Sequence, residues 1–361
     1  MNSKFTIDKF LDIVVKNDGS DLHITVGRPP TIRLHGRLRS LDLPALEPDD
    51  TLALMKSITS EKHQQELNTI GGADFSFSYR NLARFRVSIL KQKGNVGIVL
   101  RLIPSKFRTF EELGLPPVIK NLLFKPRGLV LVTGPTGSGK TTTLATMLNF
   151  INDEVDRHII TIEDPIEYVH AHKKSVITQR EIGVDVPSFA EGIRRALRQD
   201  PDVVLIGEMR DLETTSAALT AAETGHLVFG TLHTTGASRT VDRIIDQFPP
   251  NQQEQVRSQL STSLAAVISQ VIMPTFDGQG RVAAFEIMFS NSAIENYIRK
   301  NESFRIPGSI QTSRKQGMIL LDDYLYDLYT RKIISYQEMI TKAQQPNDLA
   351  EKIKELMGNK S

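Results

Sequence analysis

The chain has 361 residues, a hydrophobic fraction of 40% and a formal net charge of +2. Its length exceeds that of one typical domain, so we expect two domains with real hydrophobic cores. The weak net charge does not favour nucleic acid or an acidic membrane as a partner, and the lack of cysteine excludes disulfides and cysteine-based zinc sites.

The sequence predicts neither a secretory signal nor a membrane span. Asp8 and Asp12 interrupt the N-terminal segment, which therefore lacks the apolar centre of a signal peptide. No apolar run approaches the roughly 18 residues that a membrane-spanning helix needs. We therefore expect a soluble cytosolic protein without a transmembrane segment.

Residues 1–103 predict a small α+β domain. Apolar residues from Ile7 to Val15 recur at helical spacing and are followed by NDG at 17–19. Alternating apolar residues then predict short strands around 22–26, 32–34, 75–79, 85–89 and 96–102. The KGN sequence at 93–95 predicts a hairpin turn. We expect a mostly antiparallel sheet here and a linker at 104–117.

Residues 118–361 predict an α/β domain. Apolar runs alternate with helical segments, which favours a parallel sheet with helices on both faces. Ser188 and Glu191 have the spacing of a helix capping box, and Asp211 is placed to cap the helix that ends at Gly225.

The segment GPTGSGKTT at 134–142 satisfies the phosphate-loop pattern G-x-x-x-x-G-K-[ST], between a predicted strand and a predicted helix. Its glycines let the backbone curl so that N–H groups face phosphate oxygens, and the helix N-terminus adds a favourable dipole. Lys140 is predicted to reach the β- and γ-phosphates, and the Thr141 hydroxyl to bind Mg²⁺. We predict that the whole loop binds nucleotide: Gly134, Pro135, Thr136, Gly137, Ser138, Gly139, Lys140, Thr141 and Thr142.

Two acidic residues follow predicted strands, at Glu163 and at Glu208. Because ligands of open α/β sheets bind at the carboxyl ends of the strands, the two carboxyl groups could converge on the phosphates. We predict that Glu208 holds Mg²⁺, directly or through water, and that Glu163 orients or deprotonates the attacking water. The alternative is that Glu163 and Asp164 only cap and solvate a strand end.

Two histidines flank another predicted strand in TGHLVFGTLHTT at 224–235. His233 follows the carboxyl end, where it could face the γ-phosphate, although a lone histidine often has only a structural role. His226 precedes the strand, so we expect it to lie farther from the nucleotide.

The order of GPTGSGKTT, TIEDPIEY, LIGEMRD and TGHLVFGTLHTT resembles the type II/IV secretion ATPase superfamily. Within it, the chain resembles the PilT-like type IV pilus retraction ATPases, and the stretches GSDLHITVGRPPTIRLHG and ARFRVSILKQKGNVGIVLR resemble their PAS-like N-terminal domain. The absence of cysteine and of room for an extra N-terminal domain distinguishes the chain from the assembly and secretion members.

The resemblance implies an α/β fold in which a PAS-like domain precedes a RecA-like P-loop ATPase domain with a C-terminal helical region. It assigns Lys140 and Thr141 to Walker A, Glu163 to the catalytic glutamate and Glu208 to an atypical Walker B. It also assigns His226 and His233 to a His box, and nucleotide or subunit contacts to three arginines, Arg84, Arg86 and Arg243.

The implied function is an ATP- and Mg²⁺-dependent motor for pilus retraction and twitching motility. The family resemblance implies a homo-hexameric ring that is cytoplasmic, peripheral at the inner-membrane base of the pilus and coupled to a membrane platform protein. A PilU-like accessory retraction ATPase, or another secretion motor, is the alternative. We disfavour a nucleic-acid translocase because no aromatic–basic stacking tract is evident.

One segment departs from the family pattern. Retraction ATPases usually have a motif close to AIRNLIRE, whereas this chain has AIENYIRK at 293–300, with Glu295 in place of Arg and Lys300 in place of Glu. Ser292 and Glu295 have capping-box spacing, so we expect a short helix from Ala293. The exchange of charge either tunes partner recognition or only caps and solvates this helix.

Overall fold

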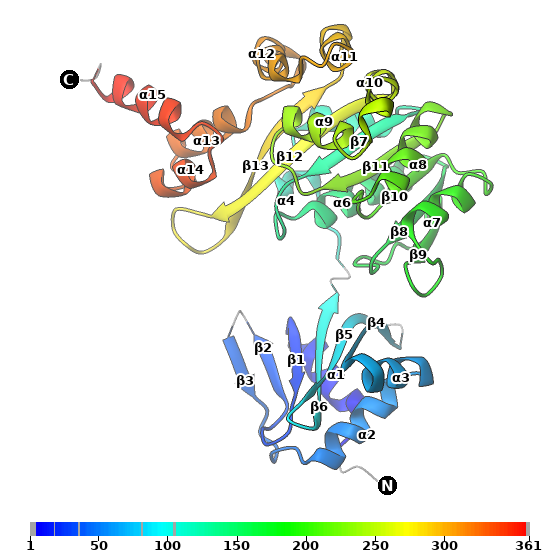
Figure 1. Cartoon of the computed structure of the whole chain (residues 1–361). Coiled ribbons are helices and arrows are strands. Elements are labelled where there is room, and N and C mark those ends of the chain that lie inside the picture. Colours follow the sequence, from blue (N-terminus) through cyan, green and yellow to red (C-terminus); the bar gives the residue numbers. More distant parts are fainter. Residues whose placement is uncertain (1–4, 18, 35–36, 81, 104–105, 359–361) are drawn as a thin grey trace. The chain divides into compact units, whose positions relative to one another are not determined.

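The computed structural model describes residues 5–17, 19–34, 37–80, 82–103 and 106–358, and it divides into two compact units (Figure 1). Unit 1 comprises Met1–Lys106 together with the segment Pro165–Val169. Unit 2 comprises Phe107–Asp164 and His170–Ser361.

Unit 1 is an α+β fold with one six-stranded sheet, as the alternating pattern predicted. The strand order is β3-β2-β1-β6-β5-β4, and each neighbouring pair is antiparallel. The strands are β1 (Asp21–Ile24), β2 (Thr31–Leu34), β3 (Arg37–Ser40), β4 (Gly72–Tyr79), β5 (Ala83–Gln92) and β6 (Asn95–Ile103), and the helices are α1 (Ile7–Lys16), α2 (Pro48–Ile58) and α3 (Glu61–Ile70). The core of this unit lies between the helices and one face of the sheet.

The predicted hairpin at 93–95 joins β5 to β6. Lys93 and Gly94 have φ angles of 50° and 78°. Positive φ at two successive turn residues matches the twist of the flanking strands, so this turn pairs them tightly. Strand β3 and helices α2 and α3 were not predicted from the sequence; every residue of β3 is exposed, which leaves no alternation to detect.

Unit 2 contains a seven-stranded sheet of order β13-β12-β7-β11-β10-β8-β9 (Figure 1). The strands are β7 (Gly128–Thr133), β8 (His158–Glu163), β9 (Val176–Glu181), β10 (Val203–Ile206), β11 (Leu227–Leu232), β12 (Leu264–Pro274) and β13 (Arg281–Phe289). Strands β7 to β12 pair in parallel, as predicted. Strand β13 is an addition at the edge, where it forms an antiparallel hairpin with β12.

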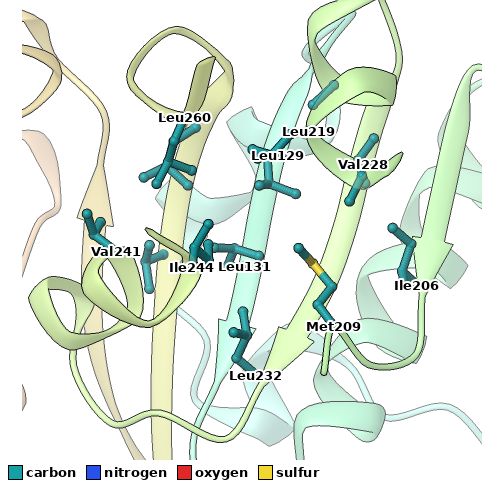
Figure 2. Close-up of a cluster of buried hydrophobic side chains, with 14 of the residues drawn as sticks. Leu129, Leu131, Ile206, Met209, Leu219, Val228, Leu232, Val241, Ile244 and Leu260 are labelled. Carbon is teal, nitrogen blue, oxygen red and sulfur yellow. The ribbon is translucent and has the colours of Figure 1, made fainter. Parts of the chain in front are cut away.

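Helices cover both faces of this sheet because its strands are apolar on both sides. Leu129 and Leu131 of β7 face a cluster formed with α7 (Phe189–Ala196), α8 (Leu212–Glu223), α9 (Ala237–Ile245) and α10 (Pro250–Ser263), part of which Figure 2 shows. Val130 and Val132 face the opposite cluster, formed with α4 (Phe110–Leu113), α5 (Lys120–Leu123) and α6 (Lys140–Glu154). Each such buried side chain contributes roughly 1.5–3 kcal/mol relative to exposure.

Part of the predicted linker 104–117 belongs to unit 2. Residues 104 and 105 lie outside the described residues, but Phe110 and Leu115 are buried in the core of the second unit. Thr109 and Glu112 form a reciprocal capping box that begins α4, so a helical turn replaces the expected open connection. The division between the units falls between Lys106 and Phe107.

Both predicted N-cap residues of unit 2 are confirmed, although for Ser188 and Glu191 only one of the two capping-box bonds is found, and the Glu191 carboxylate accepts from Arg195 Nε. The Ser188 hydroxyl accepts a hydrogen bond from the Glu191 N–H at 3.3 Å, and the Asp211 carboxylate accepts one from the Thr214 N–H at 2.8 Å. These bonds satisfy backbone donors that have no partner within the helix. Helix α8 ends at Glu223, two residues before the predicted Gly225.

The C-terminal region consists of short helices: α11 (Ser292–Arg299), α12 (Ile306–Thr312), α13 (Leu321–Thr330), α14 (Tyr336–Lys342) and α15 (Pro346–Gly358). Residues of α13 to α15 pack with Val271, Met273 and Ala284 of the β12–β13 hairpin. Among the described residues, no helix is both long enough and apolar enough to cross a bilayer.

The capping box predicted for α11, Ser292 with Glu295, is wrong. Asn291, rather than Ser292, caps the helix, because its side chain accepts the Ile294 N–H at 3.0 Å. The helix therefore begins one residue earlier than predicted. Glu295 and Arg299 do approach one another, at 3.9 Å, and this exposed pair contributes little to stability.

A buried histidine of unit 2 makes stability depend on pH. His170 stacks against Phe107 with ring centroids 4.6 Å apart, and burial lowers its pKa from 6.5 to about 4. The unfolded chain therefore binds this proton at a higher pH than the folded chain does. Stability is lost as the pH falls from about 6.5 to about 4, by up to about 3 kcal/mol.

We expect His170→Leu to remove this contribution. The measurement is the free energy of unfolding of wild type and variant by chemical denaturation at several pH values. The difference between the two proteins should change by up to about 3 kcal/mol between pH 7 and pH 4. Parallel pH profiles would show that His170 does not carry this dependence.

Candidate active site

The phosphate loop joins the fully buried strand β7 to the first turn of α6. Gly134, Gly137 and Gly139 have φ angles of 140°, 78° and 86°. Residues that carry a Cβ rarely adopt these angles. A Cβ on Gly134 would also overlap the backbone oxygen of Gln270 on β12. The loop therefore requires glycine for backbone conformation and, at Gly134, for close approach to a neighbouring strand.

Lys140 lies over this loop. Its Nζ donates to the carbonyl oxygens of Gly134, at 2.8 Å, and of Pro135, at 3.2 Å. Pro135, Thr136 and Gly137 are exposed, whereas Ser138 is buried. The loop thus has one open side, with Lys140 at its base. Thr141 and Thr142, both half-buried, follow in the first turn of α6.

Sheet register places the acidic residues at the same edge as this loop. Leu232 pairs with Thr133, and Ile206 pairs with Ile162, so these parallel strands end side by side. The Gly207 N–H also donates to the Ile162 carbonyl at 2.8 Å. Glu163, Glu208 and His233 therefore emerge from three neighbouring strands at the edge that carries the phosphate loop.

Glu208 is held by two basic side chains. Its Oε1 lies 2.8 Å from His233 Nε2 and accepts a hydrogen bond from Arg210 Nε. His233 Nδ1 lies 3.4 Å from the Thr136 hydroxyl, which connects Glu208 to the phosphate loop. The hydrogen bond from Arg210 to the Glu208 carboxylate raises the pKa of the Arg210 guanidinium above its usual value.

A pocket lies beside this network. It is lined by Glu208, Met209, Arg210, Leu232, His233, Thr234 and Arg243. Arg243 belongs to α9. This helix packs on the face of the sheet to which Leu129 and Leu131 point. The sequence singled out Glu208, His233 and Arg243, and the structure brings these three together.

Glu163 is buried and ordered by hydrogen bonds from two side chains. Its Oε1 accepts from the Thr161 hydroxyl at 2.6 Å and from Gln179 Nε2 at 3.1 Å. Gln179 Oε1 in turn accepts the His170 N–H at 2.8 Å. Glu163 and His170 flank the segment 164–169, so Gln179 is hydrogen-bonded to the residue on each side of this segment.

His226 lies away from this edge, and the other two predicted residues belong to unit 1. His226 precedes β11 and contacts the Ala221 carbonyl through Nδ1 at 3.0 Å, at the opposite end of the strand from His233. Arg84 and Arg86 lie on β5 in unit 1. Their strand alternation places both on the face opposite the buried Phe85 and Val87.

Sequence analysis missed Arg210 and Gln179. Arg210 follows Glu208 by two residues in LIGEMRD, so its proximity could have been inferred from spacing alone. Gln179 lies on β9, and its contact with Glu163 depends on the parallel pairing of β8 with β9. No sequence signal marked that contact.

The side-chain oxygen atoms of Thr141 and Glu208 are suitable ligands for Mg²⁺. Mg²⁺ is usually held by one or two protein oxygens, with phosphates and water filling the remaining positions. Thr141 and Glu208 supply a hydroxyl and a carboxylate. Within the described ranges there is no cluster of three or more His, Asp or Glu side chains, so a dedicated all-protein metal cage is not found there.

The parallel sheet, the glycine loop at a helix N-terminus and the acidic strand ends define a RecA-like P-loop ATPase domain. Residues 3–355 match the family model described as type II/IV secretion system protein. The chain belongs to this family.

Individual relatives extend the match over the whole chain. The chain is 49% identical to the type IV pilus retraction ATPase PilT of Pseudomonas aeruginosa, over 95% of this chain and 99% of the relative. It is 40% identical to the type IV pilus ATPase PilU of the same organism, over 96% and 91%. A crystal structure of the pilus retraction motor PilT with bound ADP matches with a TM-score of 0.91 and 46% identity, covering 96% of this chain and 100% of that one.

The phosphate loop yields a prediction about two of its glycines. Gly134→Ala adds a Cβ that overlaps Gln270, whereas the same change at Gly137 meets nothing within 4 Å. Gly137 has a left-handed φ of 78°, which costs an alanine about 1–2 kcal/mol, whereas the φ of 140° at Gly134 lies in a region open essentially only to glycine. Gly134→Ala should therefore weaken ADP binding far more than Gly137→Ala does.

The measurement is ADP affinity by calorimetry, with unfolding free energy as the control for global damage. Equal losses of affinity in the two variants would mean that contact with β12 does not set the loop geometry.

Proposed function

We propose that this chain is the ATP-hydrolysing motor that drives type IV pilus retraction. The observation that carries this proposal is that the phosphate loop, Glu163, Glu208 and His233 lie at one sheet edge, in a chain 49% identical to PilT over 95% of its length. The reaction is hydrolysis of ATP to ADP and phosphate. The mechanical result is removal of pilin subunits from the base of the pilus, which powers twitching motility.

In the proposed chemistry, the loop from Gly134 to Thr142 binds the phosphates and Lys140 neutralises charge on the β- and γ-phosphates. Thr141 and Glu208 would hold Mg²⁺, which would neutralise phosphate charge when bound. Glu163 accepts a proton from water as the water oxygen attacks the γ-phosphorus. His233 is placed to contact the γ-phosphate, because it lies between Thr136 of the loop and Glu208.

The position of Glu163 suits a general base. The Thr161 and Gln179 side chains fix one carboxylate oxygen, Oε1. A base whose orientation is set before the reaction loses less entropy in the transition state.

A homo-hexameric ring is the proposed assembly. Arg84, Arg86 and Arg243 are the candidates for contacts with nucleotide or with a neighbouring subunit, and an arginine supplied in this way stabilises transition-state charge. The proposed location is cytoplasmic, at the inner-membrane base of the pilus, where the ring would transmit motion to a platform protein.

A PilU-like accessory role is the alternative. It is less supported, because identity to PilU is 40% against 49% to PilT over similar lengths. Deleting the gene and scoring pilus length and twitching tests the retraction role, since loss of the main motor should leave long, non-retracting pili. Stimulation of the ATPase by single-stranded DNA would instead favour a nucleic-acid translocase.

We expect Glu163→Gln to retain ATP binding and to lose most hydrolysis, because an amide cannot accept the proton of the attacking water. Lys140→Ala should weaken binding and turnover together, since it removes a phosphate contact made in both ground and transition states. The measurements are steady-state turnover and nucleotide affinity.

Asp164→Asn provides the matched control, because it makes the same change of charge on the exposed neighbour of Glu163. That variant should turn over at a near wild-type rate. If Glu163→Gln also does so, Glu163 is not the base.

An active site shared between subunits would make the specific ATPase activity depend on assembly of the ring. If an arginine from one subunit completes the site of another, turnover per subunit should rise with protein concentration as rings form. Such arginines contribute about 10³–10⁵ in rate in other NTPases. ATPase assays should be run alongside sedimentation over the same concentrations. Full activity from a proven monomer would exclude a shared site.

A further inference from the structure

The buried amide of Gln270 connects strand β12 to the phosphate loop. Gln270 is 1% exposed. Its Oε1 accepts the Thr143 hydroxyl at 2.8 Å, and its Nε2 donates to the Ser138 carbonyl oxygen. One side chain therefore binds the last part of the loop and the first turn of α6, on either side of Lys140 and Thr141.

The orientation of this amide follows from its partners. A backbone carbonyl oxygen can only accept, so the NH₂ group must face Ser138. The amide oxygen then faces Thr143, whose hydroxyl donates to it. The Thr143 N–H also donates to the Gly139 carbonyl at 3.0 Å, which closes a compact set of contacts around the loop end.

The contact with Ser138 has a consequence for the next residue. In a planar trans peptide, the C=O and the following N–H point in opposite directions. When Gln270 binds the Ser138 oxygen on the β12 side, the Gly139 N–H is directed away from β12. N–H groups at this position of a phosphate loop are those that bind anions at a helix N-terminus.

A glycine-rich loop does not fix this orientation by itself. Gly139 has a φ of 86° and lacks a Cβ, so its own conformational preferences restrain the Ser138–Gly139 peptide weakly. Rotation of this peptide would turn a carbonyl oxygen, instead of an N–H group, toward a phosphate. An external partner for the Ser138 oxygen removes that alternative.

We propose that Gln270 is a positioning residue for phosphate recognition, and that it fixes the Ser138–Gly139 peptide so that the Gly139 N–H faces the nucleotide phosphates. This inference rests on the proposed nucleotide site and assigns it a residue on β12, outside the four nucleotide motifs. Thr143 supports the same arrangement by fixing the amide plane of Gln270.

The test compares two buried amides of unit 2. Gln270→Met keeps the length of the side chain and removes its hydrogen bonds. Asn152→Leu is the matched control: Asn152 lies near the other end of α6, is fully buried, donates to the Ala171 carbonyl at 2.8 Å and accepts the Lys173 N–H at 3.1 Å. Both variants lose an amide that bridges two groups.

The measurements are ADP affinity, displacement of ADP by inorganic pyrophosphate, and melting temperature. Both variants should melt below wild type, but only Gln270→Met should weaken binding, by about tenfold for ADP and for pyrophosphate alike. Equal loss for the two ligands is expected because Gln270 acts on the phosphate cradle and not on the base.

Thr143→Val supplies a second variant with a smaller lesion, so that the test does not depend on the folding of Gln270→Met. It should weaken both ligands by a smaller factor, since Gln270 keeps its bond to Ser138. If either variant melts lower but binds ADP and pyrophosphate as wild type does, Gln270 is only a structural amide and the inference is overturned. Failure of wild type itself to bind ADP would overturn the proposed function together with this inference.

Discussion

Strand β7 pairs with β11 on one side and with β12 on the other, and this parallel pairing sets the place of every candidate group of the ATPase domain. The strand is buried along its whole length, so its register is fixed by apolar contacts on both faces. It ends at Thr133, and at the next residue, Gly134, β12 approaches so closely that no Cβ fits. The phosphate loop thus begins from a rigid base.

The carboxylates of Glu163 and Glu208 lie at the same edge of the sheet but have different surroundings. Glu208 is bound by His233 and Arg210, two cationic or potentially cationic side chains beside an open pocket. Glu163 is buried and bound by two neutral donors, Thr161 and Gln179. In the proposed chemistry, the bonds from Thr161 and Gln179 set the orientation of the general base, whereas the basic partners of Glu208 organise charge beside the pocket.

A second buried carboxylate joins the ATPase sheet to the C-terminal helices. Glu286 of β13 accepts the N–H groups of Ala237, at 2.7 Å, and of Leu321, at 3.3 Å, and its Oε2 also accepts from Gln344 at 2.9 Å. The first two residues begin α9 and α13. Burial raises the pKa of Glu286. The helix that carries Arg243 and the C-terminal helices are therefore attached to one side chain.

Most elements of the ATPase domain and the residue types of its candidate site could be predicted from the sequence. Strand alternation, the glycine loop and the acids after apolar runs predicted the two fold types, the nucleotide loop, Glu163 and Glu208, because local periodicity and spacing encode these features. Exposed β3 and the start of α11 were missed, since an exposed strand has no alternation and several neighbouring side chains can cap a helix.

The hydrogen-bond partners of these groups became known from the packing of the strands. Gln179 on β9 binds Glu163 on β8, 16 residues away in the sequence. Gln270 on β12 binds Ser138 of the loop that follows β7, 132 residues away. Such contacts depend on strand order and register, which the pattern of one segment does not specify. The sequence therefore determined what the site contains, and the packing of the sheet determined how its residues are oriented.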